Sequence, residues 1–341
     1  MAPAARLEVT REQVLAFRRR VGALDERRPP GPQSLRQAAW AGLQDSMPRA
    51  ALLSMHARVK GIEPTTWEDP SLVQVWGPRC HVFVVAACDR AVFTLGTLPD
   101  EPHARQRAVR VAAALHAHLD GRRLPYGEAG SALAIHPYRL RYGAATGTVV
   151  IRWDGARQPT VWTVPAPDMS ADAAREELLA RYLHIYGPTG PGAFGAWAGI
   201  GAKGGVAAFA MMRPRLAPVA TPTGDAWILA EDEATVRAPA RPGAPVRLLP
   251  SGDAYLLLQG ADRELVVPDA GQRQALWTPR VWPGGLLLDG EVAGTWRRAG
   301  PVVVVSPWRR LRPRERDAVT EEVATLPLKG WASRLAVRWE E

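Results

Sequence analysis

The residues between 104 and 164 decide the fold class. ARQRAVRVAAALHAHLDG (104–121) is an amphipathic helical pattern that closes on Gly121, as helices commonly do. Two shorter helical runs follow, YGEAGSALA (126–134) and PYRLRYGAAT (137–146). TGTVVIRWDGARQPTVWTV (146–164) then predicts a β-hairpin with a polar tip at 154–157. Long helix, two short helices and a hairpin is the order of a winged helix-turn-helix.

The same order occurs on both sides of this segment. On the N-terminal side, Thr10 is a helix N-cap and Pro48 opens a further helix. The helical runs are REQVLAFRRRVG (11–22), SLRQAAWAGLQDS (34–46) and PRAALLSMHARVKG (48–61), and the strand runs are LVQVWG (72–77) and HVFVVAA (81–87). On the C-terminal side, the runs are ADAAREELLARYLHIYG (171–187), PGAFGAWAGI (191–200), KGGVAAFAMM (203–212) and the hairpin LAPVATPTGDAWILAED (216–232). The repeat is one of arrangement and not of sequence.

Beyond a Pro-rich stretch near residue 240, the pattern changes to short β runs separated by turn residues. The runs are AYLLLQ (254–259), ELVVP (264–268), GLLLDG (285–290), VAGTWRR (292–298), PVVVVS (301–306) and SRLAVRWEE (333–341), with a helix over 312–326. We therefore predict an α+β protein: three tandem winged helix-turn-helix units followed by a β-rich, largely antiparallel C-terminal domain. The expected boundaries are 1–98, 99–168, 169–240 and 241–341.

The composition favours an anionic partner. The net charge is +9, and 40 of the 43 basic residues are arginine. Residues 1–60 alone carry 11 Arg or Lys against 5 Asp or Glu. This charge is typical of nucleic-acid binding, although a GC-rich genome also raises arginine content and a solvated helix face also carries charge.

Several other classes of protein are disfavoured. Cys80 and Cys88 are the two cysteines, too few for a disulfide framework or a zinc site. No apolar run approaches the roughly 18 residues of a membrane span, and the N-terminus lacks the pattern of a signal peptide. We expect a cytoplasmic, nucleoid-associated monomer without a metal or cofactor, bound to double-stranded DNA.

Arginines and tyrosines near the predicted recognition elements are the candidates for contacting DNA. Tyr138, Arg139 and Arg141 lie on the short helix over 136–146, and Arg157 lies at the hairpin tip. The further candidates are Arg49, Arg58 and Arg79. The alternative interpretation places Tyr138 and Tyr142 in the core and leaves Arg139 and Arg79 merely solvated. Winged helices also mediate protein–protein contacts.

Five segments in order resemble a known family. They are GLQDSMPRAALLSMHARVKG (42–61), VWGPR (75–79), RYLHIYGPTGPGAFGAWAGI (181–200), RLLPSGDAYLLLQGADRELVVP (247–268) and GLLLDGEVAGTWRR (285–298). The chain resembles the winged-helix family that contains the AlkZ/YcaQ-type DNA glycosylases, which remove alkylated and interstrand-crosslinked bases. The resemblance implies three tandem winged helices, a β-rich C-terminal domain and DNA as the partner.

The resemblance also implies a catalytic position. Active members carry a Gln-x-Gln or Gln-x-acid pair just before a Pro-Arg, and here the stretch reads Gln44–Asp45–Ser46. Gln44 would orient the attacking water, while Ser46 departs from the family pair with a shorter side chain. Asp45 is a further candidate base. The alternative is a polar helix end in which Asp45 or Ser46 caps the next helix.

Two functions follow from these features. The first is a monofunctional DNA glycosylase that excises alkylated or crosslinked purines. The second is a non-catalytic DNA-binding protein of the same family, a regulator or lesion binder. The enzyme interpretation expects Gln44 and Ser46 at the mouth of a concave, arginine-lined surface. Asp253 and Arg263 are expected to form a structural ion pair.

Overall fold

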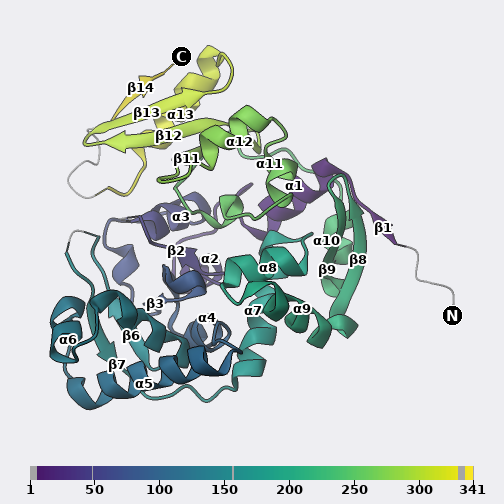
Figure 1. Cartoon of the computed structure of the whole chain (residues 1–341). Helices are drawn as coiled ribbons and strands as arrows, with labels where there is room; N and C mark the ends of the chain where they lie inside the picture. Colours follow the sequence, from purple (N-terminus) through teal and green to yellow (C-terminus); the bar gives the residue numbers. More distant parts are fainter. Residues whose placement is uncertain (1–5, 48, 156, 329–334, 341) are drawn as a thin grey trace.

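The computed structural model describes residues 6–47, 49–155, 157–328 and 335–340. Helices and three sheets alternate along the chain, which confirms the predicted α+β class. In Figure 1 the C-terminal sheet lies above α3 (Ala50–Arg58). The helices that follow residue 100 lie at the lower left, and those that follow residue 170 lie toward the right.

The described N-terminal residues form α-helices and short strands. The helices are α1 (Arg11–Val21), α2 (Pro32–Ala38), α3 (Ala50–Arg58) and α4 (Arg90–Leu95), and the strands are β2 (Leu43–Gln44), β3 (Leu72–Trp76) and β4 (Val82–Ala86). Thr10 caps α1 in a reciprocal capping box with Gln13. The predicted helix over 34–46 is wrong in its second half, because α2 ends at Ala38 and Gln44 lies on a strand. Pro48 lies outside the described residues.

The second part begins with the expected long helix. Its elements are α5 (Pro102–Leu119), β5 (Leu124–Pro125), α6 (Tyr126–Ala132), a 3-10 helix (Pro137–Thr146), β6 (Val149–Arg152) and β7 (Thr160–Thr163). Its hairpin does not stand alone, because Gln74 of β3 pairs with Ile151 of β6. The result is one six-stranded sheet in the order β2-β4-β3-β6-β7-β5, which the sequence did not predict.

The third part also has a hairpin that another strand extends. Its elements are α7 (Ala171–Tyr186), α8 (Pro191–Ala198), α9 (Gly201–Met211), β8 (Leu216–Thr221), β9 (Gly224–Leu229) and α10 (Glu233–Arg237). β1 (Leu7–Glu8) pairs in parallel with β8, so the start of the chain is tied to this part.

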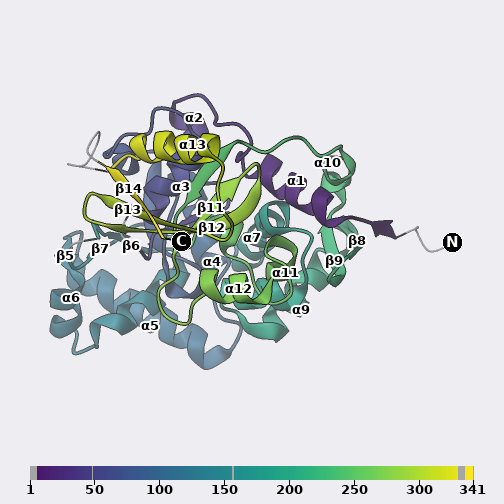
Figure 2. The ribbon, with the colours of Figure 1, turned by 90° about the horizontal axis from the view of Figure 1, so that it is seen from above.

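The C-terminal part is a five-stranded sheet packed on helices. The strands are β10 (Val246–Leu249), β11 (Gly284–Leu288), β12 (Glu291–Ala299), β13 (Val302–Pro307) and β14 (Ala336–Trp339), and the helices are α11 (Asp262–Val266), α12 (Ala270–Leu276) and α13 (Pro313–Ala324). β10 to β13 are antiparallel, as expected, whereas β14 runs parallel to β13. Figure 2, seen from above, shows the C-terminal strands and α13 drawn in front of α3.

Two predicted C-terminal strands are wrong. Residues 254–256 form a 3-10 turn because the Asp253 carboxylate accepts the backbone N–H of Tyr255. Residues 262–266 form α11. Both apolar runs are buried, so their hydrophobicity reflected burial and not extended structure.

Candidate functional site

Gln44 ends the short strand β2 beside β4, and Asp45 and Ser46 follow it, with Ser46 at a bend. Leu43 pairs with Val84 and Gln44 with Phe83, and the Asp45 N–H continues the pairing by donating to the Val82 carbonyl at 2.7 Å. Side chains alternate along paired residues, so Asp45 points to the face opposite Gln44, and continued alternation would bring Ser46 back to the Gln44 face.

Gln44 is held from two sides and stays half-buried. Arg79 Nη2 donates to Gln44 Oε1 at 3.3 Å. On the other side lies Gly252, whose φ of +76° favours glycine, and a Cβ there would lie 3.2 Å from Gln44 Nε2. The Arg79 backbone is in turn packed against Gly199 at the end of α8, where a Cβ would come within 3.0 Å of the Arg79 nitrogen. Three separate parts of the chain thus position one carboxamide.

Asp45 is buried, with 1% of its surface exposed. Its Oδ1 accepts the backbone N–H of Ala51 at 3.1 Å, and its Oδ2 accepts from Gln74 Nε2 at 2.9 Å. The first contact satisfies a free N–H in the first turn of α3, which is the capping role considered as the alternative. Asp45 therefore faces the interior, away from Gln44 and Ser46.

Burial raises the pKa of Asp45 to about 6, against the opposing effects of the Ala51 N–H, Arg49 and Gln74. The folded protein keeps this proton up to about pH 6, whereas the unfolded chain releases it near pH 4. Raising the pH from 4 to 7 should therefore remove about 2 kcal/mol of stability through this group.

The measurement is urea unfolding of the wild type and Asp45→Asn across that pH range. Since the amide does not titrate, the wild type should lose about 2 kcal/mol relative to the variant. Other titrating groups cancel in the difference. Parallel stability curves for the two proteins would show that Asp45 is ionised throughout.

Ser46 lines a cleft between the hairpin β3–β4 and the hairpin β6–β7. The cleft has a volume of about 330 Å³, and its lining residues are Ser46, Trp76, Cys80, His81, Val82, Tyr126, Arg141, Trp153 and Pro159. Ser46 Oγ lies 3.2 Å from His81 Nδ1. Sequence analysis did not single out His81, although it begins the predicted strand 81–87 and so shares the strand pair with the motif.

The candidates for contacting DNA separate into an exposed and an internal group. Tyr138, Arg139 and Arg157 are exposed, and 51% of the surface of Tyr138 is accessible. This exposure contradicts the alternative in which Tyr138 packs in the core. Arg141 is half-buried, stacks on the Tyr138 ring at 3.7 Å and reaches into the cleft beside Ser46.

Arg49, Arg58 and Arg79 belong to the internal group. Arg49 stacks on the Trp67 ring at 3.6 Å, and 19% of its side chain is exposed. Arg58 is buried and forms a bidentate ion pair with Asp253, with N–O distances of 2.7 and 2.8 Å. The expected Asp253–Arg263 pair is wrong, because Arg58 occupies the carboxylate and Arg263 Nε donates to the Leu258 carbonyl. Arg58 thus joins α3 to the C-terminal part and presents no surface to a ligand.

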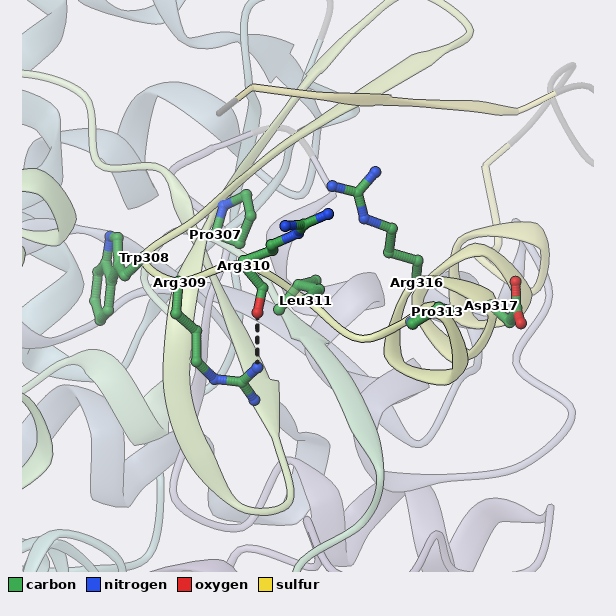
Figure 3. A pocket seen from close by; sticks show the side chains of 8 residues that line it. All are labelled: Pro307, Trp308, Arg309, Arg310, Leu311, Pro313, Arg316 and Asp317. Atoms are coloured by element: carbon green, nitrogen blue, oxygen red, sulfur yellow. Dashed lines mark hydrogen bonds between the residues drawn. The ribbon is translucent and has the colours of Figure 1, made fainter.

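A larger hollow lies elsewhere, in the C-terminal part. It has a volume of about 940 Å³ and is lined by Pro307, Trp308, Arg309, Arg310, Leu311, Pro313, Arg316 and Asp317. Figure 3 shows Arg309 donating to the Arg310 carbonyl, away from Arg316. Arg309 also pairs with Glu315 at 2.8 Å, so much of its charge is neutralised. Because this hollow contains no residue of the Gln44–Ser46 segment, we place the candidate site in the smaller cleft.

Comparison with known proteins gives the class of this fold and site. The profile of the family described as AlkZ-like, DNA glycosylase AlkZ-like, matches residues 38–327. The chain belongs to this family, and the match includes Gln44, Ser46, Arg79 and His81. No curated protein matches the sequence.

A solved structure agrees with this assignment. The Streptomyces sahachiroi DNA glycosylase AlkZ superposes with a TM-score of 0.79 over 98% of this chain and 100% of its own, at 20% sequence identity. The fold is therefore that of a DNA glycosylase. Among the described residues, no helix is long and apolar enough to cross a membrane.

Proposed function

We propose that this protein is a DNA glycosylase that hydrolyses the N-glycosidic bond of N-alkylated purines in duplex DNA. The observation that carries the proposal is the position of Gln44: its carboxamide is half-buried, accepts from Arg79, and lies two residues before Ser46, which lines the cleft. A carboxamide in a dry core, or facing away from the cleft, would not support catalysis.

The chemistry suits a carboxamide. An N7-alkylated purine carries a positive charge, so it accepts the electron pair of the C1′–N9 bond and leaves as a neutral base. Water then needs orientation at C1′ more than it needs a strong base. Gln44 Oε1 has two lone pairs, of which Arg79 engages one. The second lone pair can accept a hydrogen bond from the attacking water.

We further propose that residues 1–98, 99–168 and 169–240 act as three winged helix-turn-helix units on DNA, with 241–341 as the C-terminal domain. The exposed residues Tyr138, Arg139 and Arg157 lie on the 3-10 helix and hairpin tip of the second unit.

The test is abasic-site formation from a duplex with a single N7-methylguanine, and separately from a nitrogen-mustard crosslink. We expect wild-type protein to form product and Gln44→Ala to lower the single-turnover rate constant on the order of 100-fold, because the water loses its orienting group. Gln33→Ala, which truncates an exposed glutamine of α2, is the matched control and should leave the rate unchanged.

A non-catalytic lesion-binding role is the second candidate. The observation that favours it is Ser46, whose side chain is shorter than that of the second residue in the family pair. Salt-sensitive DNA binding by wild-type protein, without turnover of either substrate, would establish this second role and overturn the first.

A further inference from the structure

Ser46 and His81 meet because of the strand register. Leu43 pairs with Val84 and Gln44 with Phe83, so one residue forward from β2 corresponds to one residue back from β4. Extending the antiparallel register by two residues places Ser46 directly opposite His81. Directly opposed side chains have Cβ atoms about 5 Å apart, which explains the 3.2 Å contact between Ser46 Oγ and His81 Nδ1.

His81 lies among positive charges and aromatic rings. Arg79 precedes it on the 3-10 turn Pro78–Cys80, and Arg141 faces it from the 3-10 helix of the second part. The Cys80 thiol and the Tyr126 hydroxyl are the other titratable groups on the cleft wall. Burial, together with Arg79 and Arg141, lowers the pKa of His81 to about 4. The imidazole is therefore neutral at pH 7 and available as a hydrogen-bond acceptor.

We propose that Ser46 and His81 act as a hydrogen-bonded pair that replaces the second polar side chain of the family's catalytic motif. The inference rests on the proposed glycosylase function and names how this chain compensates for the shorter residue. Ser46 would contact the attacking water and so be the catalytic residue. His81, acting through Ser46, is the positioning residue.

The pair works by fixing the direction of one hydroxyl. With the proton of the imidazole on Nε2, Ser46 donates its hydroxyl hydrogen to His81 Nδ1. Both lone pairs of Ser46 Oγ are then directed away from His81, toward the cleft and toward the face that Gln44 shares. A water between Gln44 Oε1 and Ser46 Oγ would donate one hydrogen to each. Its oxygen lone pair would face C1′.

The proposed step balances. The C1′–N9 electron pair leaves with the cationic alkylpurine, which becomes neutral, and the water oxygen forms the new bond to C1′. The proton released from the water passes from the new C1′ hydroxyl to solvent, while Ser46 and His81 keep their own protons. No oxidant, reductant or second substrate is required.

The cleft beside the pair has the composition of a base-binding site. Its walls carry Trp76, Tyr126 and Trp153, and flat aromatic side chains stack on nucleobases of any sequence. A hydroxyl at its edge would therefore lie beside the sugar of a purine held between these rings.

The experiment measures single-turnover excision of N7-methylguanine from duplex DNA, together with the dissociation constant for the undamaged duplex. We expect Ser46→Ala and His81→Ala each to slow excision about 10-fold or more. The double variant should be no slower than Ser46→Ala, because residues that act as one unit are not additive. The dissociation constant should change less than 2-fold.

The variant His81→Asn distinguishes a role of His81 in orienting the Ser46 hydroxyl from a role in packing alone. The asparagine Oδ1 can stand where Nδ1 does and accept from Ser46, so excision should stay within about 3-fold of wild type. Wild-type excision should also weaken as the pH falls toward 4, while His81→Asn should lack this decline because an amide does not titrate.

The outcomes separate this inference from the proposed function. Absence of wild-type excision overturns the proposed function itself. An active wild type that is inactivated by Gln44→Ala and unaffected by His81→Ala keeps the function and overturns the pair. Additive losses in Ser46→Ala and His81→Ala would also overturn the pair.

Discussion

Asp253→Ala should lower the free energy of unfolding by about 3–5 kcal/mol. The carboxylate is 1% exposed and accepts from both terminal nitrogens of Arg58, from Ser54 Oγ at 2.6 Å and from the Tyr255 N–H. Burial alone would raise the pKa of Asp253, but Arg58 and the hydrogen bonds hold it below its usual value. Removing the carboxylate leaves Arg58 charged and buried without its partner, which is the costly outcome for an internal ion pair.

Urea unfolding monitored by circular dichroism measures this loss. Asp317→Ala, at an exposed position of α13, is the matched control and should change stability by less than 0.5 kcal/mol, since substitutions at such sites usually fall within about that range. Replacing both partners, with Arg58→Met and Asp253→Leu, should recover much of the loss because no buried charge remains. A loss below about 1 kcal/mol for Asp253→Ala would mean that water reaches Arg58.

Trp197→Ala should also cost about 3–5 kcal/mol. Trp197 is 1% exposed and packs among aromatic rings of α7 and α8, with centroid distances of 5.0 Å to Tyr182 and 5.5 Å to Tyr186. It also meets Phe83 of β4 edge-on at 6.4 Å. The truncation would leave a cavity in the largest apolar cluster and remove these ring contacts.

Trp197→Phe is the graded control, because it keeps one ring and should cost clearly less than the alanine variant. Thermal and urea unfolding should rank the three proteins in the order wild type, Phe, Ala. Equal losses for both variants would show that the site depends on the indole itself and not on filled volume.

Local patterns predicted the elements whose partners lie nearby. The helix α5, the hairpin β6–β7 and the capped helix α1 all carry their periodicity, caps and turns within a short stretch. The strand β2 could not be predicted in this way. It has two residues, and its extended conformation depends on pairing with β4, some 40 residues further along.

The candidate site residues also divide into those that local sequence indicates and those that depend on distant partners. Gln44 and Ser46 are candidates through the family resemblance, whereas the candidate His81 emerges only from the β2–β4 register. Arg58 resembled a surface arginine at the end of a helix because its partner, Asp253, is 195 residues away. Asp45 was ambiguous between helix cap and base until the strand showed which way its side chain points.

Gln74 links the hairpin β3–β4 to the hairpin β6–β7. Its carboxamide donates to Asp45 and accepts from the backbone N–H of Trp153 at 2.7 Å, and its backbone pairs with Ile151. Recombination that exchanged the second hairpin for one from a distant relative would leave Gln74 and Asp45 with mismatched neighbours. The hairpins β3–β4 and β6–β7 should therefore be inherited together. We expect chimaeric proteins joined between residues 77 and 148 to express less well than chimaeric proteins joined after residue 164.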